Sequence, residues 1–345
     1  MGESVGIATQ RDPIFDVLKG IGIVAVLCGH SGLWIHFVLT FHMPLFFFVA
    51  GYFFKQRPPR EELRLGVTRL IVPYVFISLC VCAIVVFRNL QQGFDPITPA
   101  FQDFALAHLF AFRNGAQPGW AVCRIDIAGF LCAMFWARLI VSAVLSRFSD
   151  PIAVGIVLVL GGFAANEVYH HIPVPFCLAQ GLGAAGYLYA GFRFGQLHRS
   201  KPDILVGKRC SVLVICLLLW IDFFVLTGKT SFLNLALCRY PAGYVSSIVS
   251  AACACFCIHQ FVASFYRSGP LPWKVLLFFG RYSLIAYCVH AIENYAFGPI
   301  FYGDDALFPS LDPFAILGLR LCFVTLGTLL ILHVRPLKEQ IFLIR

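Results

Sequence analysis

Apolar runs long enough to cross a lipid bilayer recur along the whole chain, separated by short polar connectors. Because the hydrocarbon core of a bilayer takes about 20 apolar residues per helix, windows of that length are the natural units of this pattern. Ten windows can be drawn, at 14–35, 37–54, 70–87, 120–143, 152–169, 177–196, 211–227, 243–265, 276–295 and 314–334. The pattern predicts an all-α integral membrane protein of about ten transmembrane helices, with residues 1–345 forming one transmembrane domain and no separate soluble domain.

Two windows depart from the simplest pattern. The eighth is the least distinct, because Pro241 and Gly243 interrupt an apolar run that begins at Phe232. The first is too long for the core of a signal peptide and is followed by no small-residue cleavage site, so we expect it to remain as a helix.

Composition supports the membrane assignment. Of the 345 residues, 59% are hydrophobic and only 12% are charged, and the mean hydropathy is +0.82. These values lie outside the range of soluble globular domains. Most of the 14 Cys residues lie inside the apolar windows, where thiols behave as small hydrophobic groups, and the sequence shows neither a disulfide framework nor a CxxC zinc pattern. Nothing in the sequence indicates nucleic-acid binding.

The basic residues are distributed unevenly between the connectors. If the N-terminus lies inside the cell and the ten windows alternate, most of the 26 Lys and Arg residues fall on the cytoplasmic side, as the positive-inside rule requires. Arg88, Arg124 and Arg320 are among the few assigned to the outer side. We therefore predict a multi-pass protein of the plasma (cell inner) membrane with both termini cytoplasmic and the net charge of +9 concentrated on the inner surface.

The first window carries ionisable groups in an apolar setting. Such a group costs several kcal/mol unless it is paired or faces water, so each one is a candidate for function. Lys19 and His30 share one helix face, about 16 Å apart in height, with Asp16 one turn from Lys19. His42 follows at the start of the next window, so we expect His30 and His42 to line one cavity. A neutral imidazole there can take the proton of a hydroxyl group.

A second polar face runs along the ninth window. Ser283, Tyr287, His290 and then Glu293 or Asn294 follow one another at helical spacing. We expect this face to reach the depth of His30 in the outer half of the membrane. A purely structural role in helix–helix hydrogen bonds is the alternative for His290 and Glu293.

Four segments carry a family likeness. The sequence FDVLKGIGIVAVLCGHS, followed by FHMPLFFFVAGYFF, resembles the opening of the acyltransferase-3 family of membrane O-acyltransferases, including the fucose O-acetylase-like branch. The family's basic residue, ten intervening residues and histidine fall on Lys19 and His30. The segments RLIVPY at 69–74 and GRYSLIAYCVH at 280–290 are similar to its third-helix entry and to its late Gly, Ser-Leu, Tyr and His pattern.

The resemblance implies an enzyme of roughly ten helices that takes an acyl group, usually acetyl, from cytosolic acyl-CoA. The acceptor it implies is a hydroxyl of a cell-surface or lipid-linked carbohydrate. The expected partners are therefore acyl-CoA, a carbohydrate or glycolipid and the lipid bilayer, and no metal is expected. Arg69 corresponds to the family's basic third-helix entry, but the second Arg of that motif is Gly66 here, and Arg64 is its nearest substitute.

The likeness and the chemistry of the side chains together suggest roles. Guanidinium and ammonium groups at the inner mouth suit the phosphates of CoA, and His30 is expected to deprotonate the acceptor hydroxyl as it attacks the thioester. Donor binding is assigned to Lys19, Arg64 and Arg69. Catalysis is assigned to His30, His42, His290 and Glu293. Acceptor binding is assigned to Tyr287 and to the fourth-window residues Trp120, Arg124 and Asp126.

Two other functions would use the same polar groups. A multi-span transporter would couple ion or proton movement through intramembrane His, Glu and Lys side chains, although no inverted repeat of the polar faces is evident. A metal site would use the spacing of His290 and Glu293, but the sequence shows no second ligand set. Consumption of an acyl-CoA thioester separates an acyltransferase from a transporter. The sequence leaves acetyl and larger acyl groups such as succinyl open.

Overall fold

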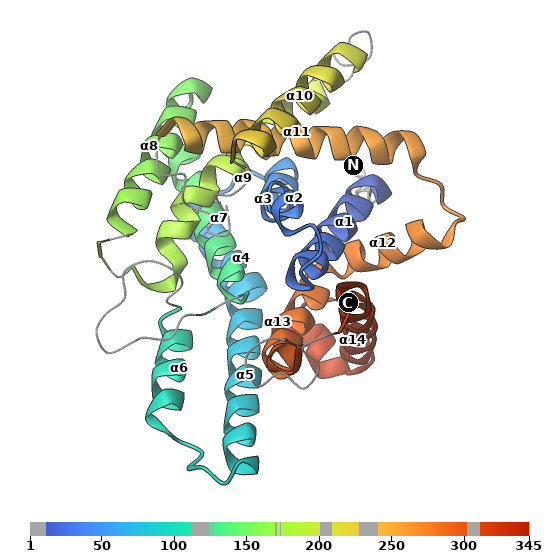
Figure 1. The fold of residues 1–345 in the computed structure, drawn as a ribbon. Coiled ribbons are helices and arrows are strands. Elements are labelled where there is room, and N and C mark those ends of the chain that lie inside the picture. The colour runs from blue at the N-terminus through green and yellow to red at the C-terminus, as the bar shows by residue number, and fades with distance from the viewer. Residues whose placement is uncertain are drawn as a thin grey trace, which may run out of the picture.

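The computed structural model describes residues 12–111, 125, 127–169, 171–172, 174–200, 209–227, 241–301 and 311–344. Within these ranges the regular secondary structure is entirely helical (Figure 1). This confirms the prediction of an all-α protein. Trp120, Arg124 and Asp126 lie outside the described residues, as does the beginning of window 120–143.

The helices follow one another with short connections. The first half contains α1 (Pro13–His30), α2 (Ile35–Val38), α3 (His42–Tyr52), α4 (Pro59–Gly66), the π-helical turn η1 (Val67–Ile71), α5 (Val72–Gln91), α6 (Pro99–Leu109) and α7 (Gly129–Arg147). The second half contains α8 (Pro151–Tyr169), the 3₁₀ turn η2 (Pro175–Cys177), α9 (Leu178–Ser200), α10 (Arg209–Thr227), α11 (Pro241–Phe265), α12 (Leu271–Arg281), α13 (Ser283–Phe301), α14 (Pro313–His333) and the π-helical turn η4 (Leu337–Ile341).

Several helices begin with the same local device, a capping side chain followed by proline. Asp12 accepts a hydrogen bond from the backbone N–H of Ile14 at the start of α1, and Asp312 accepts one from that of Phe314 at the start of α14. Thr98 caps α6 in the same way. The capping side chain accepts a hydrogen bond from a backbone N–H that has no partner within the helix. Proline at the first helical position costs no hydrogen bond, because the N–H that it lacks would have no partner there.

Six helical segments of the described residues are long and apolar enough to cross a membrane: Pro13–His30, Ile35–Tyr52, Pro59–Gln91, Gly129–Arg147, Gly243–Phe265 and Pro313–His333. The bent pair Leu271–Arg281 and Ser283–Gly298 adds a seventh if it forms one span, and Pro151–Ala165 and Cys210–Asp222 are shorter apolar helices. The chain is therefore a multi-pass membrane protein. Ten spans and cytoplasmic termini stay predictions.

The helix boundaries correct three of the windows. Window 14–35 ends early, at His30, where the Ser31 hydroxyl bonds back to the Leu27 carbonyl and Gly32 adopts a φ of +80°. Window 37–54 is divided between α2 and α3. Window 276–295 crosses an 84° bend between α12 and α13, because Tyr282 leaves the helical conformation.

Glycines allow the central helices to touch backbone to backbone. A Cβ atom at Gly280 of α12 would overlap the Asp16 carbonyl of α1, and one at Gly20 would overlap the Leu276 carbonyl of α12. Gly51 of α3 meets α9 in the same way. Because lipid tails are as apolar as the helices, close packing through small residues is a main source of helix association in membranes.

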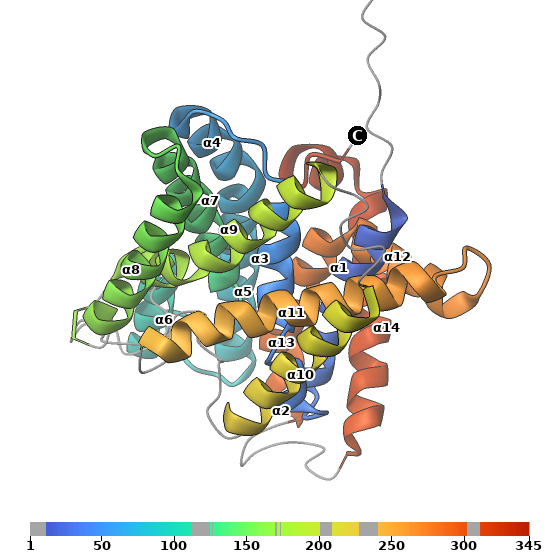
Figure 2. The same ribbon diagram turned by 90° about the horizontal axis from the view of Figure 1, so that it is seen from above.

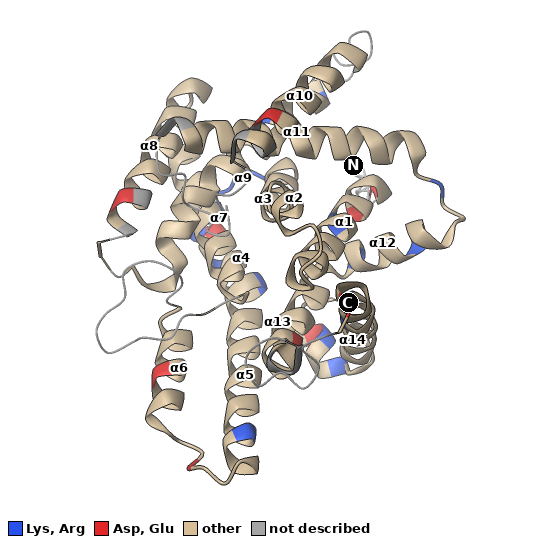
Figure 3. Cartoon of the chain, viewed as in Figure 1, with Lys and Arg blue, Asp and Glu red and all other residues tan. Residues whose placement is uncertain are grey.

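α1 and α3 lie near the centre of the fold, and α12 lies against the outer side of α1 (Figure 1). α11 lies across α1, α3 and α9 and carries α10 on its far side, as Figure 2 shows from above. Charged side chains are sparse along the helices, but acidic and basic residues lie side by side where α13 meets α14 (Figure 3). Large apolar side chains such as Leu79, Leu160 and Leu330 are exposed on the surface, which suits a lipid environment.

The contact between α1 and α12 predicts the effect of one added methyl group. Gly280→Ala forces two backbones apart and lowers the free energy of unfolding by about 1–3 kcal/mol. Gly318→Ala is the matched control, because a Cβ at Gly318 of α14 meets no atom within 4 Å. Thermal unfolding of both variants in detergent measures the difference. Equal midpoints for the two variants would contradict the backbone contact.

Candidate functional site

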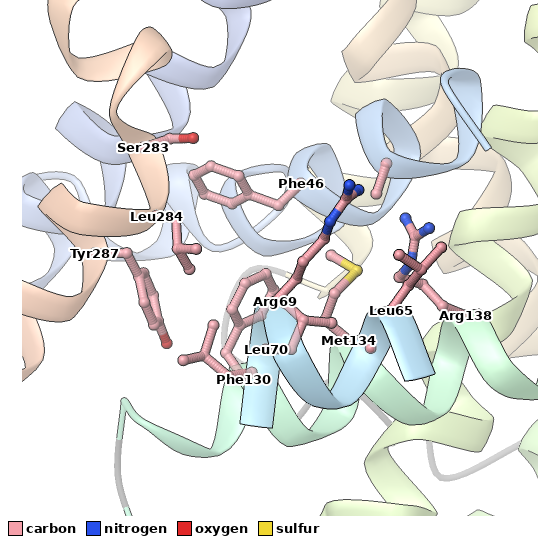
Figure 4. A pocket seen from close by; sticks show the side chains of 13 residues that line it. Phe46, Leu65, Arg69, Leu70, Phe130, Met134, Arg138, Ser283, Leu284 and Tyr287 are labelled. Atoms are coloured by element: carbon pink, nitrogen blue, oxygen red, sulfur yellow. The ribbon is translucent and has the colours of Figure 1, made fainter. Parts of the chain in front are cut away.

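A cavity of about 260 Å³ lies between α3, α4 with η1, α7 and α13 (Figure 4). Most of its wall is apolar, formed in part by Phe46, Leu70, Phe130 and Met134. The polar side chains are Arg69, Arg138, Ser283 and Tyr287. The cavity thus combines an apolar wall with two cationic side chains.

The two arginines differ in what holds them. Arg138 donates through Nε and Nη2 to Oε1 of Glu62, each at 2.6 Å, and Glu62 is 1% exposed on α4. Arg69 forms no ion pair with the described residues and lies in the π-helical turn η1. Such turns often mark functional sites, because the extra residue alters the direction of the following side chains. The guanidinium groups lie on the same side of the cavity (Figure 4), where Arg69 is available for an anion.

The other end of the cavity is held by Tyr287 of α13. Its hydroxyl donates a hydrogen bond to the backbone carbonyl of Ile127, and its ring lies 5.1 Å from the ring of Phe130 between centroids. Tyr287 therefore fastens α13 to the segment that enters α7. His290 follows one turn further along α13.

A buried ionic cluster begins at that turn. His290 Nδ1 lies 2.9 Å from Oε2 of Glu293, and Arg320 of α14 donates through Nη1 to the same oxygen at 2.8 Å. Arg320 also donates to the side-chain oxygen of Asn294 at 3.3 Å. His290, Glu293 and Arg320 are each 1% exposed. The ring of His30, from the last turn of α1, lies 5.0 Å from that of His290 between centroids.

The partners of His290 decide which of its nitrogens carries the proton. An ionised carboxylate can only accept hydrogen bonds, so beside the Arg320 cation Glu293 favours the tautomer with hydrogen on Nδ1. The other nitrogen, Nε2, is buried and has no hydrogen-bond partner among the described residues. The arrangement therefore presents an orientated imidazole with a free lone pair, next to a second imidazole. No group of three His, Cys, Asp or Glu residues suited to a metal ion occurs in the described ranges.

Three other residues expected at the site, Lys19, Arg64 and His42, lie outside the wall of this cavity. Lys19 Nζ lies 2.6 Å from Oδ1 of Asp16, which agrees with the expected shared helix face, and Lys19 does not line the cavity. Arg64 is exposed on α4 and is also absent from the cavity wall. His42 is buried at the start of α3, where Nδ1 bonds to the carbonyl of Val38 at 2.7 Å. Val38 packs against Gly29 beside His30.

Arg320, Arg138 and Glu62 are not among the site residues expected from the sequence. Arg320 lies inside α14, where Glu293 neutralises it, and its assignment to the outer side of the membrane stays a prediction. The sequence did contain a signal for Arg320, because an arginine inside an apolar window needs a buried acidic partner. Glu62 lies inside the polar helix α4 and Arg138 in the middle of α7, and nothing in the sequence marks the two as partners.

Comparison with known families adds one finding. The family model described as an acyltransferase domain, Acyl_transf_3, matches residues 12–333. No curated protein matches the chain. The match contains all the residues of the cavity and of the buried cluster.

The cluster predicts strong coupling between Arg320 and Glu293. Arg320→Met leaves a buried carboxylate without its cation, which costs about 3–5 kcal/mol of the free energy of unfolding. Adding Glu293→Gln removes that charge, so the double variant is less destabilised than the sum of the single variants. Thermal unfolding of the four proteins measures the coupling.

The control is the exposed pair of Arg335 and Glu339, whose shortest separation is 3.0 Å. Exposed pairs contribute little because water screens them, so Arg335→Met leaves the unfolding midpoint nearly unchanged. Strictly additive effects of Arg320→Met and Glu293→Gln would contradict the predicted coupling.

Proposed function

Because the chain belongs to the acyltransferase-3 family, we propose that this membrane acyltransferase moves an acyl group, acetyl by default, from cytosolic acyl-CoA to a hydroxyl group of a cell-surface or lipid-linked carbohydrate. The observation that carries the proposal is the position of the arginine-bearing apolar cavity one helical turn from the His30 and His290 pair. Tyr287 of α13 belongs to the cavity wall, and His290 of the same helix belongs to the pair.

The cavity has the polarity that an acyl-CoA donor requires. CoA carries phosphate charges at one end and a thioester at the end of a long, weakly polar arm. Arg69, which has no acidic partner among the described residues, is the natural contact for a phosphate. The apolar wall formed by Phe46, Phe130 and Met134 suits the arm. In this arrangement the thioester points along α13 toward His290.

The transfer proceeds by attack of the acceptor oxygen on the thioester carbonyl. His30 takes the hydroxyl proton as the new C–O bond forms, which makes the oxygen a better nucleophile. The tetrahedral intermediate then collapses, the C–S bond breaks, and the CoA thiolate leaves toward the cytosol. The proton held by His30 passes to the thiolate, so the enzyme returns to its starting state.

His290, Glu293 and Arg320 support this step. Glu293 and Arg320 fix the orientation of the His290 ring, and the lone pair on its Nε2 can accept a hydrogen bond from His30 or from the acceptor. His42, Trp120, Arg124 and Asp126 stay candidates for the acceptor side. Lys19 contributes positive charge in the second turn of α1.

Substitutions at His30 and Lys19 separate chemistry from binding. In nanodiscs with radiolabelled acetyl-CoA, His30→Ala retains donor binding and lowers acyl transfer and thioester loss by about 10²–10⁴-fold, because the general base is removed. Lys19→Ala weakens donor binding less than Arg69→Ala does, because Lys19 lies outside the cavity and is paired with Asp16 at 2.6 Å. The control is His36→Ala, since His36 is exposed on α2.

Two results would contradict these assignments. A folded His30→Ala protein that consumes the donor at the wild-type rate excludes His30 as the base. Failure of the wild type to bind acetyl-CoA and longer acyl-CoAs would favour a transporter, in which the buried groups couple ion or proton movement.

The cavity also predicts a difference between two neighbouring arginines. Arg69→Ala weakens binding of acetyl-CoA about tenfold, because it removes the cation of the cavity wall that has no acidic partner among the described residues. Arg64→Ala changes the affinity by less than about twofold, since its side chain is exposed outside the cavity. Isothermal titration of both variants measures the effect. Equal losses would show that the donor does not enter this cavity.

A further inference from the structure

A second, more polar cavity lies where α7 ends and α8 begins. It has a volume of about 350 Å³ and is bounded by the end of α7, the start of α8, the middle of α9 and the segment before α4. Arg147, Arg193, Gln56 and Gln196 supply much of its polar wall. None of the functional candidates that belong to the described residues lies in it.

The wall has the chemistry of a site for a nucleotide phosphate. Two arginines face the cavity, and no carboxylate is among the described residues that line it. Arg193 donates through Nη1 to Oε1 of Gln196 at 2.6 Å, which holds its guanidinium group while other N–H groups stay available. An arginine presents several donors in one plane, a geometry that matches phosphate oxygens.

The same cavity offers aromatic surface. Its floor includes the buried side chains of Tyr189 and Phe192, and Phe148 lies at its edge with 41% of its surface exposed. Tyr189 is fixed in place because its hydroxyl donates to the carbonyl of Pro151 at 2.8 Å. Aromatic rings beside arginine groups suit a flat, electron-rich base.

The two cavities follow one another along α7. Phe130 and Arg138 line the first cavity, and Leu145 lines the second. At about 1.5 Å per residue, the distance along the helix from Phe130 to Leu145 is about 22 Å. Figure 4 shows α7 running beneath the first cavity from Phe130 to Arg138. The two cavities therefore lie in succession along one helix, within the length of an elongated ligand.

The chain segment that contains Gln56 and Arg57, before α4, is held by hydrogen bonds to α7. Ser142 donates to the carbonyl of Arg57 at 2.7 Å, and Gln56 donates through Nε2 to the carbonyl of Leu145 at 3.1 Å. These bonds place the chain before α4 alongside the last turns of α7. Both cavities are thus built on the same rigid helix.

We propose that the Arg147 and Arg193 cavity is the nucleotide subsite of the donor, with Arg193 binding the 3′-phosphate of the CoA adenosine and the aromatic floor contacting the base. This inference rests on the proposed function, because it extends the donor site from the Arg69 cavity along α7. The arm of CoA then passes Arg138 and brings the thioester toward His290.

The contact between Arg193 and the 3′-phosphate is tested by removing the arginine from the protein and, separately, the phosphate from the donor. Affinities for acetyl-CoA and for acetyl-dephospho-CoA, which lacks only the 3′-phosphate, are measured by isothermal titration of wild type and Arg193→Gln in nanodiscs of neutral lipid. Arg193→Gln weakens acetyl-CoA binding about tenfold and leaves acetyl-dephospho-CoA binding within about twofold of wild type. Arg147→Gln is a second variant with the same expected selectivity.

The matched control is Arg267→Gln, because Arg267 is exposed in the connection between α11 and α12 and bonds only to nearby carbonyls among the described residues. It leaves the affinity for both donors unchanged. If Arg193→Gln and Arg147→Gln weaken both donors equally or neither, the nucleotide assignment is wrong while the proposed function stands. If wild type binds neither donor, the proposed function itself is wrong.

Anionic lipid is the other source of phosphate at such a surface. Repeating the titrations in nanodiscs that contain phosphatidylglycerol distinguishes the two sources. A nucleotide subsite keeps its preference for acetyl-CoA over acetyl-dephospho-CoA in both membranes. Loss of that preference only when anionic lipid is present would assign the cavity to a lipid headgroup and overturn the proposal.

Discussion

The need to neutralise a charge inside an apolar bundle determines how the last two helices pack. Glu293 lies between Arg320 and His290, and all three are almost completely buried. An unpaired charge at this position would carry a large desolvation cost, so α13 and α14 are constrained to the rotation at which the groups meet. The same contact holds His290 against the end of α1, where His30 lies.

A second constraint comes from close backbone contacts. Gly20 and Gly280 let α1 and α12 approach until their backbones touch, and the chain bends by 84° directly after α12. The bend starts α13 at Ser283, on the wall of the cavity, so one face of α13 serves two sites. Its first turns contribute Ser283 and Tyr287 to the cavity, and its later turns contribute His290 and Glu293 to the buried cluster.

The side chains that line the two cavities change from polar to apolar between the last and the first turn of α7. The polar cavity at the end of the helix contains Arg193, the middle of the helix carries Arg138, and the first turn carries Phe130 beside Tyr287. The proposed donor, with phosphates at one end and a thioester at the other, would follow this order of polar and apolar groups. Glu62 keeps Arg138 in position, which leaves Arg69 as the adaptable cation of the first cavity.

The sequence by itself determined the class of protein, the approximate helices and the polar face of α13. These features are local, because apolar length and helical spacing depend only on neighbouring residues. Lys19 and His30 were also placed on one helix for this reason. The bend at Tyr282 and the end of α1 at His30 were missed, since Ser31, Gly32 and Tyr282 interrupt helices inside continuous apolar runs.

Only the tertiary structure decided which polar groups meet. Arg320 reaches Glu293 across α13 and α14, and Glu62 reaches Arg138 across α4 and α7. It also separated Arg69, on the cavity wall, from Arg64, which the sequence had grouped with it. Such pairings depend on helix rotation and on glycine contacts between segments far apart in the chain, and no local pattern of residues specifies them.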